Sequence, residues 1–203
     1  VRPGTIMAAV DTPTVIISGP GGHGAIPHKS ADPIVAAAAV VMALQTIVAR
    51  NVDPTEPAVV TVGTFNAGTA CNVIPESAKL EISVRSCSPP VRKLLAERIQ
   101  AIVKGVAEAH GCKAAIDYEM GYPATINTAD ETAFARAVAA GLQGDHPIID
   151  LPAPTVISED FAYMLEARPG CYFMLGNGDG PERKMLHTPD YDFNDELTVI
   201  AAG

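Results

Sequence analysis

"PAVVTVGTFNAGTACNVIPESAKLEISVRSC", residues 57–87, is the stretch that decides the fold. It holds two runs typical of strands, residues 57–68 and 78–87, and a turn region rich in Gly, Asn and Pro joins them. The second run alternates apolar and polar side chains, which indicates a strand with one buried face. Its inward side chains are Leu80, Ile82 and Val84.

A helix is predicted on each side of these two strands. Upstream, Asp32 is a suitable N-cap, a proline follows it, and an alanine-rich apolar segment runs to about Arg50. Downstream, residues 88–111 begin with Ser88 as the cap, carry apolar side chains at helical spacing and end at a glycine. The first helix is apolar nearly all round, so we expect other elements to cover it on most sides.

Two further strands, residues 14–18 and 113–126, complete the order strand, helix, strand, strand, helix, strand. This order is the split β-α-β, ferredoxin-like pattern. The sequence therefore predicts a four-stranded antiparallel sheet with two helices on one face.

The character of the chain changes after residue 127. Thr128 and Glu131 form a capping box that opens a helix to about Leu142. Residues 154–178 indicate a short strand, a short helix and a buried strand at residues 171–175, and another helix is expected to start near the end of the chain. The residues after 127 are too few for an independent α/β domain. We therefore expect them to be the end of a larger domain.

Composition excludes several classes of partner. The net charge is −9 and the pI is about 4.9, without a cluster of Lys or Arg, so nucleic acid and anionic membranes are not expected partners. The apolar run at residues 33–44 is shorter than the roughly 20 residues of a membrane span. The four cysteines form no C-x-x-C motif and no targeting signal is seen, which favours a reducing cytoplasm.

The segment "GPGGHGAIPH", residues 19–28, fits G-x-G-x-x-G in its first six letters. A dinucleotide site also needs a helix at the last glycine and an acid about 20 residues on, and neither is present. The better candidate is His23, which lies between two glycines on an open loop. Its imidazole could donate to an oxyanion, act as a base or bind metal, or it could be a loop histidine bonded to backbone.

Other candidate side chains are more ambiguous. His187 follows the predicted buried strand and is either a metal ligand or a surface histidine. Asn72 and Arg85 could together hold a substrate carboxylate, or they could form an Asx-turn and a surface ion pair. Ser158 and Glu159 could supply ligand or acid/base groups, or they could cap the helix that follows.

Four motifs occur in a familiar order: "GGHGAIPHKSADPIVAAA", "GTACNVIPESAKLEISVRS", "ISEDFAYML" and "LHTPDYDF". Together they resemble the C-terminal part of the M20 metallopeptidase family, in its amidohydrolase branch. The resemblance implies a ferredoxin-like lid at residues 12–122, of α+β type, inserted into an α/β catalytic domain. Residues 1–11 would end the first catalytic segment, and residues 123–203 would be the C-terminal part of that domain.

The same resemblance implies roles for individual residues. His23 would close over the substrate, frequently in the partner subunit's site, and polarise the scissile carbonyl. Asn72 and Arg85 would lie near the substrate carboxylate, and His187 would be the last metal ligand. Ser158 and Glu159 would line the pocket.

Such an enzyme would bind two divalent ions, zinc or manganese and alternatively nickel or cobalt, and form a homodimer through the lid. Its substrate would be a small N-acyl amino acid or peptide, of which it hydrolyses the amide bond. The family's other metal ligands and its general base are not in this sequence, so we expect the 203-residue chain alone to be inactive and to hold no stably bound metal. The alternative is a non-catalytic lid module that dimerises through a sheet edge or a helix pair.

Overall fold

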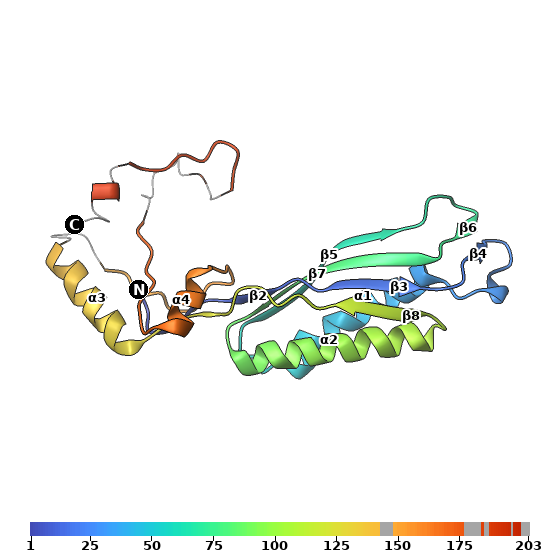
Figure 1. Cartoon of the computed structure of the whole chain (residues 1–203), viewed down its shortest axis with the longest axis horizontal. Coiled ribbons are helices and arrows are strands. Elements are labelled where there is room, and N and C mark those ends of the chain that lie inside the picture. The colour runs from blue at the N-terminus through green and yellow to red at the C-terminus, as the bar shows by residue number, and fades with distance from the viewer. Residues whose placement is uncertain (143–147, 177–183, 185–186, 196, 200–203) are drawn as a thin grey trace.

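The computed structural model describes residues 1–142, 148–176, 184, 187–195 and 197–199. The chain is elongated: a lid built of one sheet and two long helices lies at one end, and a smaller tail carrying both termini lies at the other (Figure 1). The lid elements are β2 (Ala9–Asp11), β3 (Thr14–Ser18), β4 (Gly22–His23), η1 (Pro27–Lys29), α1 (Pro33–Asn51), β5 (Ala58–Ala67), β6 (Val73–Ile74), β7 (Ser77–Ser86), α2 (Pro89–Ala109) and β8 (Lys113–Asp117). The tail elements are β1 (Gly4–Met7), β9 (Thr125–Asn127), α3 (Ala129–Leu142) and α4 (Phe161–Ala167).

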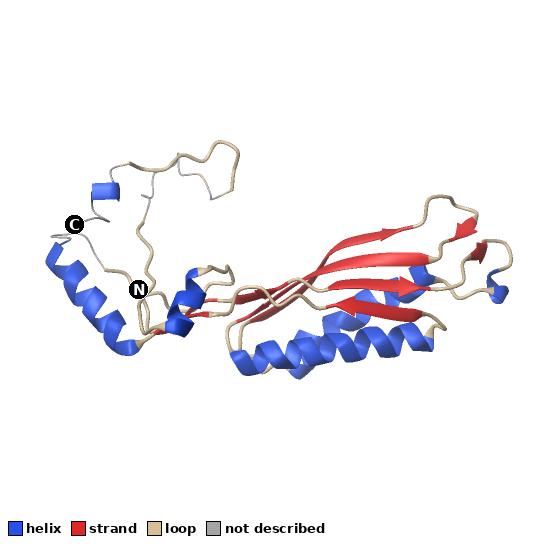
Figure 2. Cartoon of the chain, in the orientation of Figure 1, coloured by secondary structure: helices blue, strands red, loops and turns tan. Residues whose placement is uncertain are grey.

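The lid sheet has the strand order β5-β7-β3-β8, and every neighbouring pair is antiparallel. In chain order this is the arrangement 2-3-1-4 of a ferredoxin-like fold, and α1 and α2 cover one face of the sheet (Figure 2). The predicted ferredoxin-like architecture is therefore confirmed. In addition, β2 pairs with the end of β7, so that β2 and β3 together follow β7 along its whole length.

The core lies between the sheet and the two helices. Along β7 the buried side chains alternate with more exposed ones, as the sequence predicted, and Leu80 has no exposed surface. α2 contributes a stripe at every fourth residue: Val91, Leu95, Ile99, Val103 and Ala107. This spacing places all five side chains on one face of the helix, where burial of apolar surface stabilises the lid.

α1 begins as predicted, because the Asp32 carboxylate accepts a hydrogen bond from the Ile34 amide at 2.8 Å. The face of α1 that carries the small side chains of Ala36 and Ala37 is buried. On the opposite side, Val35 is 52% exposed and Met42 is 71% exposed. The expectation that this helix is covered on most sides is therefore wrong for the described residues. One face contacts the sheet and α2, and no described element covers the opposite face.

By length and composition, α1 is the one helix within the described ranges that could cross a membrane. It nevertheless contacts α2, β3, β5 and β7 along its buried face. This packing is what a core helix of a folded domain shows.

The cap of α2 differs from the prediction. Ser88 occupies the N-cap position with extended backbone, but its side chain makes no cap hydrogen bond. A cap side chain bonds the amide of the second or third helical residue, and here Pro89 and Pro90 fill the first two positions without an N–H group. The prolines set the start of the helix instead.

The tail agrees with the sequence in part. α3 begins after Thr128 and ends at Leu142, as predicted, and α4 forms where a short helix was expected. The capping box itself differs: the Thr128 hydroxyl donates to the Glu131 side chain, and the Thr128 N–H donates to the Gly170 carbonyl instead of to Glu131. The strand expected near residue 154 is reduced to a single bridge between Thr155 and Met7. The helix expected near the end is seen at residues 197–199, and its remaining residues lie outside the described ones.

The buried strand expected at residues 171–175 is wrong. These residues form no strand, and Phe173 is 47% exposed. The Asn127 side chain takes the place of a neighbouring strand: its amide donates to the Tyr172 carbonyl at 2.8 Å, and its oxygen accepts from the Tyr172 N–H at 2.7 Å. The segment is thus extended without belonging to a sheet.

Replacing Leu80 with Ala is expected to lower the free energy of unfolding by about 2 to 5 kcal/mol, because it leaves a cavity in the core of the lid. Lys104→Ala on the exposed side of α2 is the control and should change the free energy of unfolding by less than about 0.5 kcal/mol. Urea unfolding followed by circular dichroism measures both variants. Equal losses for the two variants would contradict the described burial of Leu80 on β7.

The cysteines are expected to react with a thiol reagent in a defined order. Cys71 is exposed, whereas Cys87 and Cys112 are buried. Desolvation by burial raises the pKa of the Cys87 and Cys112 thiols, so less reactive thiolate is present at pH 8. Mass spectrometry after limited alkylation should find Cys71 modified first, and the difference should vanish in urea. Early modification of Cys112 in the folded chain would contradict this placement.

Candidate functional site

His23 lies at the tip of the lid, in a short ladder between β4 and β6. His23 pairs with Val73, and the Gly24 N–H donates to the Asn72 carbonyl at 2.8 Å. A Cβ atom at Gly24 would lie 3.1 Å from that carbonyl oxygen, so a glycine permits the two loops to approach this closely. The glycines of this loop therefore support the histidine.

The hydrogen bonding of the His23 ring defines what it can offer. Its Nδ1 accepts a hydrogen bond from the Ala25 N–H at 3.0 Å, and the side chain is exposed. A nitrogen that accepts cannot carry the proton, so the neutral ring carries it on Nε2 and presents an N–H donor. The hydrogen bond to backbone that is expected of a loop histidine is therefore present. The same hydrogen bond leaves the Nε2–H free to donate to a ligand.

Asn72 is brought close to the His23 loop, since it lies in the turn directly before β6 and its carbonyl accepts from the Gly24 N–H. Its side chain is exposed. The tip therefore presents an imidazole on β4 and an amide in the neighbouring turn. Both side chains can form hydrogen bonds to a polar ligand.

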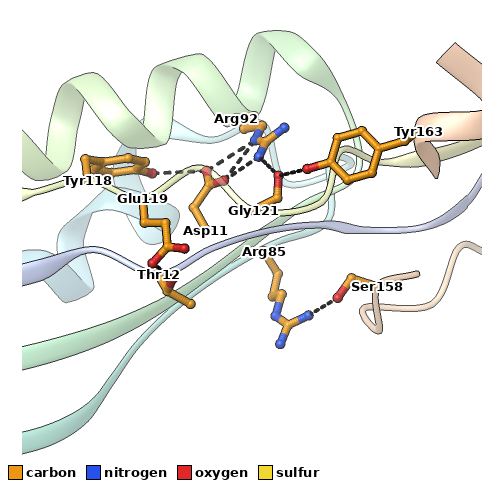
Figure 3. A network of polar contacts seen from close by, with 9 residues as sticks. All are labelled: Asp11, Thr12, Arg85, Arg92, Tyr118, Glu119, Gly121, Ser158 and Tyr163. Atoms are coloured by element: carbon orange, nitrogen blue, oxygen red, sulfur yellow. Dashed lines mark hydrogen bonds and ion pairs between the residues drawn. The ribbon is translucent and has the colours of Figure 1, made fainter. Parts of the chain in front are cut away.

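Arg85 lies at the opposite end of the lid. It pairs with Val10 of β2 and Val59 of β5, and its Nη1 donates to the Ser158 hydroxyl at 2.8 Å (Figure 3). Ser77, which is close to the tip, and Arg85 are eight residues apart on β7, or about 26 Å at the usual rise of a strand. Within one chain the structure thus separates Arg85 from Asn72, which were expected to hold one carboxylate together.

Ser158 and Glu159 precede α4 and face the base of the lid. The Glu159 carboxylate accepts hydrogen bonds from the Asp160 N–H at 3.1 Å and from the Tyr172 hydroxyl at 3.3 Å. Burial in the first place, and then the negative charge of Glu159, raise the pKa of Tyr172 above its ordinary value. The phenol therefore stays protonated and donates to an ionised Glu159. No side chain caps α4, so the capping interpretation of Ser158 and Glu159 does not hold, and the two residues lie at the lid base through their bonds to Arg85 and Tyr172.

His187 is exposed and adopts a left-handed backbone conformation with φ of 70°. Among the described residues no group of three His, Cys, Asp or Glu side chains could hold a metal ion. The part of the chain in view thus supplies one candidate ligand and does not fit a two-metal centre by itself. The structure is compatible with His187 as a metal ligand and with His187 as a surface histidine.

Sequence reasoning missed a polar network at the lid base, where Asp11, Arg92 and Tyr118 meet (Figure 3). Asp11 is only 1% exposed and forms an ion pair with Arg92 at 2.5 Å. The one signal in the sequence is a carboxylate that ends an apolar run, "IMAAVD". Nothing in the sequence pointed to its partners.

Known proteins are similar to this chain in sequence and in fold. The Peptidase dimerisation domain, M20_dimer, matches residues 10–111. The chain is 40% identical over 202 residues to hippurate hydrolase from Campylobacter jejuni, covering 100% of this chain and 52% of that protein. It is 39% identical over 204 residues to N-acetyl-L-cysteine deacetylase from Bacillus subtilis, covering 100% of this chain and 47% of that one.

Among solved structures, the chain resembles the Bacillus subtilis YXEP protein, described as a dinuclear metal binding peptidase from the M20 family. The TM-score is 0.75 at 27% identity, over 100% of this chain and 49% of that one. The chain spans about half the length of the curated relatives it matches. Since the dimerisation-domain match covers half of its 203 residues and includes the His23 loop and the strands β3, β5 and β7, the chain belongs to the M20 peptidase family.

Proposed function

We propose that this chain is the lid and part of the catalytic domain of a metal-dependent amidohydrolase that hydrolyses the amide bond of N-acyl amino acids. The observation that carries the proposal is the His23 ring, whose Nδ1 accepts from the Ala25 N–H and whose Nε2 is thereby a donor. The names of the two relatives, hippurate hydrolase and N-acetyl-L-cysteine deacetylase, support this substrate class.

In this proposal the Nε2–H of His23 donates to the carbonyl oxygen of the scissile amide. When the carbonyl carbon is attacked, the oxygen gains negative charge, and the same hydrogen bond becomes stronger. The imidazole therefore stabilises the transition state more than the bound substrate.

Arg85 is proposed to bind the carboxylate of the amino-acid part. One guanidinium nitrogen is already held by the Ser158 hydroxyl, which orients the planar group. Such a fork suits a carboxylate better than a lysine would. Asn72 would donate from its amide on the other side of the substrate, and Glu159 would line the pocket beside Tyr172.

A second copy of the chain would complete this site. His23 and Arg85 are about 26 Å apart or more along one lid, which is longer than an N-acyl amino acid. We therefore propose a homodimer in which His23 of one chain reaches the Arg85 end of another. The exposed apolar side chains of α1 and of the edge strand β5 offer a surface for that contact, and they include Val35, Met42, Val59 and Phe65.

Two divalent ions, zinc or manganese in the first place, belong to the proposed whole protein. His187 would be one ligand from this chain. Because the described residues do not fit such a centre by themselves, we derive no step through the metal. The four free cysteines suit the proposed cytoplasmic location.

A second candidate function is a dimerisation module without catalysis. The match of residues 10–111 to a dimerisation domain favours it. In this second candidate function, His23 only stabilises its loop and does not contact a substrate.

The 203-residue chain is expected to be inactive by itself. In the described ranges it has one candidate metal ligand, His187, without a group of three. An assay with hippurate and added zinc or manganese should show no turnover above that of the metal salt, and metal analysis after desalting should find no stoichiometric ion. Turnover that disappears in His23→Ala would contradict this expectation.

In the whole protein, His23→Ala and Arg85→Ala are each expected to reduce kcat/KM strongly. Loss of one oxyanion donor typically reduces kcat about 100-fold to 1,000-fold. His28→Ala, on the neighbouring η1 turn, is the matched control and should retain activity.

Mixing these two inactive variants after dissociation and reassociation tests the shared site. A mixed dimer has one site with both residues intact, so about a quarter of the wild-type activity should return if half of the dimers are mixed. No recovery, with mixed dimers present by native mass spectrometry, would contradict a site shared between copies. Full activity of His23→Ala would remove His23 from the mechanism and favour the non-catalytic module.

A further inference from the structure

The lid is joined to the tail by two connections that lie side by side. Residues 10–12 lead into the lid and residues 119–122 lead out of it. The Val10 N–H donates to the Tyr122 carbonyl at 3.0 Å, and the Thr12 N–H donates to the Glu119 carbonyl at 2.9 Å. The Gly121 N–H returns a bond to the Val10 carbonyl at 3.0 Å. The two connections thus form an antiparallel ribbon, which we call the linker ribbon.

Arg92 of α2 contacts both halves of the linker ribbon. Its Nε and Nη2 donate to the Asp11 carboxylate at 2.5 to 3.2 Å, and Nη2 also donates to the Gly121 carbonyl at 2.8 Å. Asp11 is 1% exposed and the Arg92 side chain is 14% exposed. Because both charges are largely removed from water, each depends on the other for compensation. The guanidinium of Arg92 therefore links the incoming and the outgoing connection to α2 at one point.

Neighbouring groups hold the linker ribbon in the same arrangement. A Cβ atom at Gly121 would lie 2.8 Å from the Val10 carbonyl oxygen, so only glycine permits this close approach. The Tyr118 hydroxyl donates to Asp11 at 3.3 Å, and the Tyr163 hydroxyl of α4 donates to the Gly121 carbonyl at 3.4 Å. Figure 3 shows these groups converging on the linker ribbon from the lid and from the tail.

Direct packing between α2 and α4 does not set the angle of the lid. A cavity of about 310 Å³ lies beside Arg92, lined on the lid side by Ser88 and Pro89 and on the tail side by Ala162 and Leu165. The start of α2 and the helix α4 thus face each other across open space. Polar contacts therefore hold the orientation: those of the linker ribbon, the Arg85–Ser158 hydrogen bond at 2.8 Å, and the bond from the Thr5 hydroxyl to the Cys87 carbonyl at 3.0 Å. Among them, only the Arg92 contacts join both connections of the linker ribbon to α2.

We propose that Arg92 is a positioning residue that fixes the angle between the lid and the tail by clamping the linker ribbon. With the clamp in place the linker ribbon moves as one body with the lid. This inference concerns the shape of the chain itself and does not require the proposed hydrolysis to be correct.

The test measures the distance between spin labels in the 203-residue chain. Cys71 at the lid tip is exposed, and Phe134→Cys places the second label on α3, where the native side chain is 72% exposed. Cys171→Ser removes a partly exposed competitor, and Cys87 and Cys112 are buried. Arg92→Met should broaden the distance distribution or shift its maximum.

Two controls separate a change of angle from general damage. Arg98→Met, also on α2, removes an arginine whose Nε donates to the Asn51 side chain far from the linker ribbon, and it should leave the distribution unchanged. A label pair within the lid, Cys71 and Lys104→Cys, should keep its distance in the Arg92→Met variant. Arg92→Lys keeps the positive charge but cannot form the bidentate contact with Asp11. If Arg92→Met does not fold, Arg92→Lys takes its place, and its lid-to-tail distribution should be broader than that of the unsubstituted chain.

An unchanged lid-to-tail distribution in Arg92→Met, with the lid pair intact, would overturn the proposal. So would equal broadening in Arg98→Met. Broadening in Arg92→Met and Asp11→Asn alone, with a constant distance inside the lid, is the outcome that supports it.

Discussion

The lid depends on the register of β7. This ten-residue strand is hydrogen-bonded on both sides, to β5 at one edge and to β3 and β2 at the other. Because side chains alternate along a strand, a shift of one residue would turn Leu80, Ile82 and Val84 away from α1 and α2. Burial of these side chains therefore specifies the pairing of the whole sheet. The same register places Arg85 on the opposite face, at the base.

The length of β7 separates two groups of candidate site residues. At the tip, the β4–β6 ladder holds His23 beside Asn72, and at the base Arg85 contacts Ser158. Each group is held by close backbone contacts or hydrogen bonds within one chain, yet the two groups are about 26 Å apart or more. A lid of this shape can bring both groups to one small ligand only if two copies combine.

Local patterns of the sequence predicted the ferredoxin-like sheet and the long helices, because periodicity and caps act within a few residues. Contacts between distant residues were not predictable in this way. Arg92 bonds Asp11 across 81 residues, and the Asn127 side chain takes the place of a strand partner for Tyr172 across 45.

The candidate site shows the same limit. His23 stood out through its flanking glycines, but its pairing with the Asn72 loop rests on strands of two residues, which are too short for a periodic signal. The exposed face of α1 was missed for a related reason. An apolar sequence indicates that a helix face is suited to burial. It does not indicate whether an element of the same chain packs against that face.

The distance between tip and base makes the position of the tip sensitive to the angle at the linker ribbon. A rotation of about 10° at the linker ribbon would move a group about 26 Å away by roughly 4 to 5 Å. An error of about 1 Å in the position of a catalytic group can already reduce the rate about 100-fold. In the proposed dimer, the site lies between the lid base and the tail of one chain, and His23 comes from the other. A stiff linker ribbon, held by the buried Asp11–Arg92 pair, keeps Arg85 of the lid beside Ser158 of the tail. The buried ion pair of the lid thus lies at its base, where a small change of angle moves the tip the most.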